Sequence, residues 1–305
     1  MTNVYAPHFH DADKAREHLE AIRWPDGAEC PHCGLIDATK IEGKSARPGL
    51  YQCNKCRQQF TVTVGTVFER SKVPLQKWLL ATHLMCASKK GISAHQLHRM
   101  LGVTYKTAWF MAHRIREAMK DDGSPLGGEG VTVEADETYI GKDKSAQPSR
   151  TPIHNMNKVV SLVDRTTGRS VSFHVTDGIT ADTISYILYT NVHRSSRLVT
   201  DEANIYKRPG MSYAAHETVN HAAKEYARGD ITTNTIEGFF GIFKRGMRGI
   251  YQHCSSKHLH RYLAEFDFRY TKRIANGFDD MTRAVEVLKG ISGKRLTYRR
   301  TLSAS

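Results

Sequence analysis

Val131-Thr132-Val133-Glu134-Ala135-Asp136 alternates apolar and polar side chains and closes on an aspartate. Such alternation is typical of a half-buried β-strand. Two more strands are expected at 158–163 and 170–175. The composition of residues 164–168, which lie between these two strands, favours a hairpin turn. This stretch therefore begins a sheet.

Helices and a further strand follow. Apolar residues at helical spacing predict a helix over 180–192, and 196–201 is expected to be a strand. Longer helices are expected over 233–249 and 256–273. The order of strands and helices indicates an α/β domain with a mixed sheet.

Acidic residues that are distant in the sequence fall at the ends of these elements. Asp136 and Asp201 each close a predicted strand, and Glu237 follows Asp201 after 35 intervening residues. Two-metal phosphoryl transfer needs hard oxygen ligands on rigid elements, which predicts a site made of these three acids. The alternative is that the aspartates are turn residues and that Asn234 and Glu237 begin a helix as N-cap and N3 acid.

The helix over 233–249 carries one apolar stripe at the spacing of a buried face, formed by Ile236, Phe239, Phe240, Phe243 and Met247. The neighbouring stripe carries Glu237, Lys244 and Arg248. We expect Lys244 to hold a DNA phosphate. Asn234 is an alternative to Glu237 as the third metal ligand.

Four of the six cysteines form two pairs, Cys30 with Cys33 and Cys53 with Cys56, separated by 19 residues. Pairs at this spacing can place four thiolates around a structural zinc ion, which replaces the core that so small a segment lacks. A redox dithiol is the alternative, but it needs only one such pair. Gly34 follows the first pair, where such turns favour positive φ. A strand over 58–64 would complete this zinc module.

A helix-turn-helix pattern follows the zinc module. After a helix that opens near Pro74, Ser93 and Thr104 are expected to cap helices over 94–101 and 105–119, with Gly102 ending the first. We expect the second helix to enter the major groove of DNA. An ordinary three-helix packing unit is the alternative. The cations expected to contact DNA are Lys106, His113 and Arg114 here and Lys244, Arg245 and Arg248 further on.

Length and charge agree with this division. The chain has 305 residues, a net charge of +13 and a pI near 9.5, which favours nucleic acid as partner. No apolar run reaches the roughly 18 residues of a membrane span, and residues 1–20 lack the apolar core of a secretory signal, so a cytoplasmic location without a membrane partner is expected. The expected domains are a helix with the zinc ribbon (1–66), the helix-turn-helix (67–122), the sheet domain (129–290) and a flexible basic tail (291–305).

Several of these motifs resemble those of the bacterial insertion-sequence transposases with an N-terminal zinc ribbon, the IS1595 family. The resemblance covers about residues 15 to 275 and rests on the cysteine pairs, the helix-turn-helix and the segments Phe60–Glu69, Glu134–Gly141, Asn234–Lys244 and Tyr262–Arg269. It implies an RNase H-like, integrase-type catalytic domain that uses Mg²⁺ or Mn²⁺. Asp136, Asp201 and Glu237 match the family's three acids. Some relatives use an Asn near the third position followed by a Lys, which keeps Asn234 and adds weight to Lys244.

The function expected from motifs and resemblance together is that of a transposase. It would bind the terminal inverted repeats of an insertion sequence and catalyse Mg²⁺-dependent cutting and strand transfer. Its partners would be double-stranded DNA, at element ends and target, and further copies of itself in a dimer or larger assembly on the bacterial nucleoid. One alternative is a zinc-ribbon and helix-turn-helix regulator with an inactive sheet domain. Another is an RNase H-like nuclease that cuts without joining.

Overall fold

The structure is a computed structural model that describes residues 4–43, 45–143, 149–220 and 227–297. The chain separates into two compact units, Met1–Met119 with Phe278–Ser305 and Lys120–Gly277. The finer domain boundaries stay predictions. The two units differ from the predicted domains at the C-terminal end of the sheet domain, which was expected to reach residue 290. The helix α9 (Asp280–Lys289) belongs to the first unit instead.

The first unit begins with the helix α1 (Ala12–Arg23) and a small antiparallel sheet in the order β1-β2-β3. Its strands are β1 (Ala38–Lys40), β2 (Tyr51–Cys53) and β3 (Gln59–Phe60). The predicted strand over 58–64 is therefore confirmed only at its start. Beyond Phe60 the chain forms two turns in place of a strand. In these turns Val64 N–H donates to the Thr61 carbonyl at 3.0 Å, and Thr66 N–H donates to the Thr63 carbonyl at 3.3 Å.

Three helices follow the ribbon: α2 (Leu75–Ala87), α3 (Ala94–Leu101) and α4 (Tyr105–Ala118). The predicted caps are confirmed. Ser93 Oγ accepts from Gln96 N–H at 3.1 Å, and Thr104 Oγ1 accepts from Thr107 N–H at 3.2 Å. Gly102 ends α3 with φ +59°. Two helices joined by a three-residue turn are thus present as expected, and their DNA-binding role is a separate matter.

Two cations expected to contact DNA lie inside this unit. His113 is 0% exposed and Arg114 is 8% exposed. Arg114 donates through Nε to the Leu296 carbonyl at 3.1 Å and through Nη2 to the Glu69 carbonyl at 3.2 Å. The burial of both side chains contradicts the prediction that His113 and Arg114 face the DNA. A C-terminal segment covers α4 at Arg114.

That C-terminal segment belongs to the tail predicted to be flexible. Val67 N–H donates to the Ile291 carbonyl at 3.1 Å, and Lys294 Nζ donates to the Ala118 carbonyl at 3.2 Å. The prediction is therefore wrong for residues 291–297, which are bound to the first unit. The rest of the tail lies outside the described residues.

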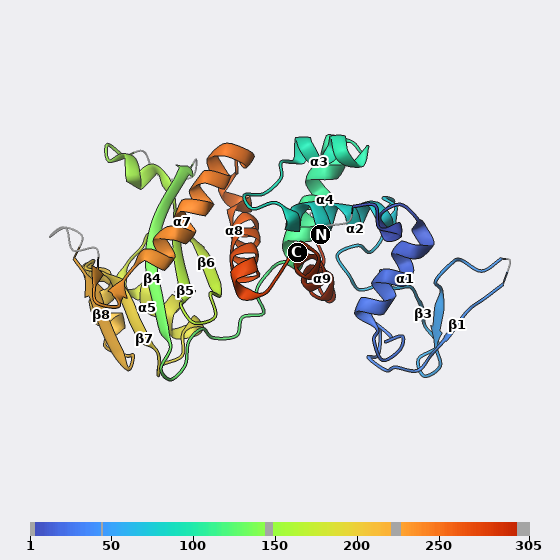
Figure 1. Cartoon of the computed structure of the whole chain (residues 1–305), viewed down its shortest axis with the longest axis horizontal. Helices are drawn as coiled ribbons and strands as arrows, with labels where there is room; N and C mark the ends of the chain where they lie inside the picture. Colours follow the sequence, from blue (N-terminus) through green and yellow to red (C-terminus); the bar gives the residue numbers. More distant parts are fainter. Residues whose placement is uncertain (1–3, 44, 144–148, 221–226, 298–305) are drawn as a thin grey trace, which may run out of the picture. The chain divides into compact units, whose positions relative to one another are not determined.

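The second unit is built on a five-stranded sheet in the order β6-β5-β4-β7-β8 (Figure 1). β4, β5 and β6 are antiparallel neighbours, whereas β7 and β8 run parallel to β4. This is the mixed sheet of an RNase H-like domain, as expected. The strands are β4 (Thr132–Lys142), β5 (Met156–Asp164), β6 (Ser170–Val175), β7 (Arg197–Asp201) and β8 (Ala215–Val219).

Helices cover both faces of this sheet. The helices α5 (Ala181–Asn191) and α6 (Asn204–Gly210) share one core with Val133, Ala135 and Leu198. The helices α7 (Asn234–Gly246) and α8 (Ser256–Thr271) share the other core with Ile140, Val159 and Val163. The apolar stripe predicted on α7 is confirmed, since all five of its side chains are buried in that second core. A short hairpin of β9 (Ala227–Arg228) and β10 (Ile231–Thr232) precedes α7.

Strand β6 lies at an edge of the sheet, where outward N–H groups need partners. The helix α8 supplies them. Ser172 N–H donates to Asp267 Oδ2 at 2.9 Å, and Ser170 N–H donates to Thr271 Oγ1 at 3.0 Å. The hydroxyl of Ser172 donates to the other Asp267 oxygen at 2.8 Å. Side chains of α8 thus complete the hydrogen bonding of this edge, beside which the helix lies in Figure 1.

No helix in the described part of the chain combines the length and the apolar character that crossing a membrane requires.

Asp267 makes the stability of this edge depend on pH. Burial raises its pKa to about 7, whereas an unfolded carboxyl titrates at about 3.9. The stability gained from the protonated form is present below about pH 4 and lost as the pH rises through about 7. We expect the free energy of unfolding of the wild type, relative to Asp267→Asn, to fall between about pH 4 and about pH 8 in urea titrations. A difference that stays constant over this range would contradict the assignment.

Candidate functional site

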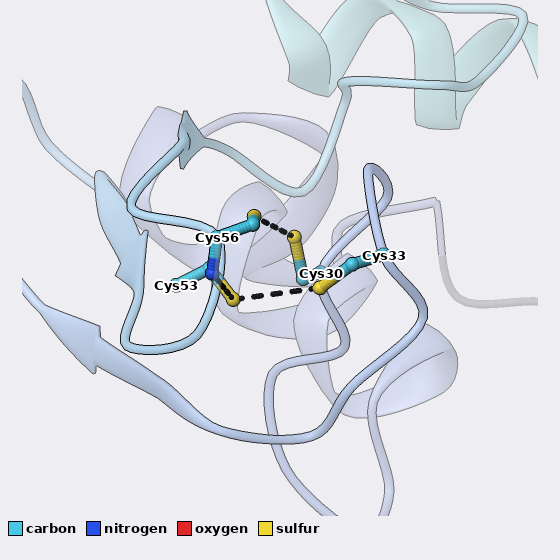
Figure 2. Close-up of side chains that lie close together, drawn as sticks. All are labelled: Cys30, Cys33, Cys53 and Cys56. Carbon is cyan, nitrogen blue, oxygen red and sulfur yellow. Dashed lines mark hydrogen bonds between the residues drawn. The ribbon is translucent and has the colours of Figure 1, made fainter.

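The four paired cysteines lie together in the first unit, with their sulfurs pointing toward one another (Figure 2). The Sγ atoms are 3.6 Å apart between Cys30 and Cys56 and 3.6 Å apart between Cys33 and Cys53, and all four lie within 4.8 Å of one another. Zinc–thiolate bonds of about 2.3 Å in a tetrahedron place sulfurs roughly 3.8 Å apart. The four residues therefore fit a structural zinc ion.

Both cysteine pairs have the same local backbone. Gly34 N–H donates to the Cys30 carbonyl at 2.8 Å, and Arg57 N–H donates to the Cys53 carbonyl at 3.0 Å. The residue after each pair has positive φ, +76° at Gly34 and +60° at Arg57. Two equivalent turns thus present two sulfurs each, and the expectation for Gly34 is confirmed.

In the second unit, Asp136 and Asp201 lie on neighbouring parallel strands. β4 pairs with β5 well beyond Asp136, so the prediction that a strand ends at this residue is wrong, whereas Asp201 does end β7. Glu134 of β4 stands opposite Val199 of β7, and the two aspartates come two residues later on each strand. Side chains alternate across a strand, so both aspartates face the same side of the sheet.

Glu237 lies in the first turn of α7, the helix that packs on this side of the sheet. The N-cap of α7 is Thr233, and Asn234 is the first residue of the helix. Thr233 Oγ1 donates to Glu237 Oε1 at 2.7 Å. The cap in which Asn234 would pair with Glu237 is therefore not formed, and both side chains are exposed.

Electrostatics link the three acids. Burial, which has the largest effect, and the negative charges of Glu137, Asp201 and Glu237 together raise the pKa of Asp136 to about 8. The backbone N–H of Glu137 donates to Asp136 Oδ1 at 2.7 Å and acts in the opposite direction. Asp136 thus lies within the fields of carboxylates from β7 and α7.

Oxygen donors of like charge in one place are the set that Mg²⁺ and Mn²⁺ prefer, because a divalent cation offsets their repulsion. The three acids therefore offer donors of the chemical type that such an ion takes. Their arrangement is more open than that of the sulfurs. Within the described ranges, the four cysteines form the one group of three or more metal-binding side chains found close together.

The cations predicted on α7 differ in their surroundings. Lys244 is half-buried, whereas Arg245 and Arg248 are exposed. Arg248 lies in a π-helical turn, Met247–Tyr251, that continues α7. A π turn holds more residues than an α turn, so the stripe predicted from α-helical spacing does not extend to Arg248. In the first unit, Lys106 is exposed on the first turn of α4.

Glu134 and Arg165, which are not among the site residues predicted from the sequence, meet beside the acids. Arg165 Nε donates to Glu134 Oε1 at 2.5 Å, and Glu134 is 0% exposed. Strand alternation places Glu134 on the same face as Asp136, which was a usable signal. Arg165 lies in the hairpin turn after β5 and carried no such signal.

Comparisons with known proteins cover both units. Residues 125–271 match an ISXO2-like transposase domain, and residues 10–59 match a transposase zinc-ribbon domain. The chain is 30% identical over 277 residues to an uncharacterized protein in transposable element ISH50 of Halobacterium salinarum, which covers 84% of this chain and 90% of the relative. Among solved structures, a chain of the simian T-cell lymphotropic virus intasome in complex with PP2A regulatory subunit B56 gamma is 16% identical, with a TM-score of 0.30. That match covers 56% of this chain and less than two thirds, 63%, of the other.

Removal of zinc tests the cysteine site. We expect one zinc ion per chain by elemental analysis and its loss in Cys53→Ser. We also expect faster amide hydrogen exchange over residues 26–66 after chelation, because the metal replaces a core there. Cys254→Ser is the matched control, since Cys254 lies outside the cluster, and it should keep the zinc. Equal zinc content in both variants would refute the site.

Proposed function

Because the chain belongs to the IS1595 family of insertion-sequence transposases, we propose that it binds the terminal inverted repeats of a mobile element and cuts and joins DNA at Asp136, Asp201 and Glu237. The observation that carries this proposal is the pairing of β4 with β7, which puts Asp136 and Asp201 on the face of the sheet on which α7, with Glu237 in its first turn, packs. The raised pKa of Asp136 agrees with this arrangement, since perturbed carboxyl groups are common at functional sites.

The acids would hold Mg²⁺ or Mn²⁺. When bound, such an ion makes a better nucleophile of water or a DNA hydroxyl and stabilises the leaving oxygen. In the first reaction, water attacks the phosphodiester at the element end and a 3′-hydroxyl leaves. In the second, this hydroxyl attacks a target phosphodiester. One P–O bond forms as another breaks, so the reaction consumes no cofactor.

Other side chains near the acids would bind and orient the DNA. Lys244, half-buried on α7 two turns beyond Glu237, is suited to hold a backbone phosphate close to the cut. Arg245 is exposed beside it and would contact phosphates further along the strand. Asn234 remains an alternative third ligand, since it is exposed in the same helical turn as Glu237.

The first unit would supply recognition of the element ends. Lys106 lies on the exposed first turn of α4, where a helix of this kind meets base edges or phosphates in the major groove. The zinc ribbon would add a second contact to the same DNA. Since two element ends must be joined in one reaction, we propose that the chain acts as a dimer or larger assembly on DNA.

Asp136→Asn tests the chemistry. We expect Mg²⁺-dependent cutting and joining of labelled element ends to fall to the uncatalysed background, because one acid of the proposed site loses its charge. Binding of the same DNA in a mobility-shift assay should persist. Asp177→Asn, a substitution of an exposed aspartate in the same unit, is the control and should retain activity. Full activity of Asp136→Asn would remove Asp136 from the proposed site, whereas a wild type that never cuts DNA with Mg²⁺ would favour the regulator.

Pre-cut ends separate a transposase from a nuclease. The wild type given ends that already carry a 3′-hydroxyl should yield products covalently joined to target DNA, visible as longer labelled strands. A nuclease of the same fold would cut but yield no joined strand.

Salt dependence tests the role of Lys106. The logarithm of the binding constant should fall steeply with the logarithm of salt concentration, and Lys106→Ala should reduce that slope by about 1. Lys289→Ala is the control, because Lys289 is exposed in the same unit but pairs with Glu286 at 2.9 Å. Identical slopes for Lys106→Ala and the wild type would remove Lys106 from the interface.

A further inference from the structure

Glu134 is fully buried on β4, two residues before Asp136 and on the same face. Both of its oxygens have donors. Oε1 accepts from Arg165 Nε at 2.5 Å, and Oε2 accepts from the backbone N–H of Ile236 at 2.8 Å. The Ile236 N–H belongs to the first turn of α7, where N–H groups have no partner within the helix. Glu134 thus caps, from the sheet, the helix end that carries Glu237.

Arg165 extends this connection to the segment before α7. Its Nη1 donates to the Asp230 carbonyl at 2.7 Å, and its Nη2 donates to the Thr232 carbonyl. Its own backbone N–H donates to the Thr132 carbonyl of β4 at 3.0 Å. Arg165 therefore links β4 and the carboxylate of Glu134 to Asp230 and Thr232, which lie just before α7.

A second arginine holds the same segment from another strand. Arg197 of β7 forms ion pairs with Asp230 and with Glu217 of β8. The stretch before α7 is thereby fixed against β4 and β7, the two strands that carry Asp136 and Asp201. Glu237 follows the capped residue Ile236 directly, so its place relative to both aspartates depends on these contacts.

We propose that Glu134 and Arg165 are positioning residues, which set Glu237 at metal-binding distance from Asp136 and Asp201 through the first turn of α7. This rests on the proposed function, in which the three acids share a divalent cation. Glu134 itself is not assigned as a ligand, because both of its oxygens are taken up by the Arg165 and Ile236 donors. Groups that orient metal ligands in this way typically change metal affinity by about 10- to 100-fold when altered.

A buried ion pair can also serve stability alone, and the same unit offers a matched control. Glu265 and Arg269 form a buried pair on α8, in which Glu265 also accepts from the Tyr251 hydroxyl at 2.6 Å. This pair has the same chemistry as Glu134 with Arg165, but it joins α8 to Tyr251, which lies beyond the C-terminal end of α7 and far along the chain from Glu237. Glu265→Gln therefore reports the general cost of disturbing a buried pair.

The test measures two properties of the full-length protein: Mn²⁺ affinity, from the electron paramagnetic resonance signal of free Mn²⁺, and hydrogen exchange of peptides over residues 230–240. In Glu134→Gln we expect Mn²⁺ affinity to fall by at least about tenfold and exchange over 230–240 to accelerate. Glu265→Gln should leave both at wild-type values, whatever it does to thermal stability. Arg165→Lys keeps the charge but loses the fork of donors, and it should give the same changes if Glu134→Gln does not fold.

Asp136→Asn separates failure of this inference from failure of the proposed function. If Asp136→Asn weakens Mn²⁺ binding while Glu134→Gln and Arg165→Lys bind as the wild type does, the positioning role is wrong and the acidic site stands. If Asp136→Asn also binds Mn²⁺ unchanged, the site itself is wrong and the inference falls with it. Equal loss of affinity in Glu134→Gln and Glu265→Gln would reduce the pair to a stabilising contact.

Discussion

The gathering of Asp136, Asp201 and Glu237 on one face of the sheet is the constraint on which the proposed chemistry of the second unit depends. Parallel pairing of β4 with β7 puts two aspartates side by side on one face. The phenylalanines of α7 pack that helix onto the same face and bring Glu237 toward them. The raised pKa of Asp136 registers what this costs, because burial and like charge both disfavour its ionised form. In the proposed function, a divalent cation would offset this cost.

Strand β4 connects this site to its surroundings through the residues that flank Asp136. Glu134 caps α7, which carries Glu237. Glu137, on the opposite face, accepts from the Tyr206 hydroxyl of α6 at 2.7 Å, and α6 follows Asp201 closely in the chain. Glu134 thus contacts the helix that carries Glu237, and Glu137 contacts the helix that follows Asp201. Relative positions in the site therefore depend on one strand rather than on flexible loops.

Local chemistry made much of this predictable from sequence. Ser93, Gly102 and Thr104 act within a few residues, and their helix ends were confirmed, as was the apolar stripe of α7. Properties set by distant segments were not predictable. Arg114 looks like a surface cation until the C-terminal segment packs over α4. Asp136 looks like a strand end until β5 extends the pairing past it. The role of Glu134 likewise depends on a turn, at Arg165, that no periodicity marks.

The most direct measurement of the central claim is the anomalous diffraction of Mn²⁺ in crystals of the full-length protein. The account predicts a peak in the second unit with carboxylate oxygens of Asp136 and Asp201, and of Glu237 or Asn234, at about the 2.1 Å typical of small divalent ions. Saturating Mn²⁺ with no peak among these residues, or a peak held by other acids, would contradict it.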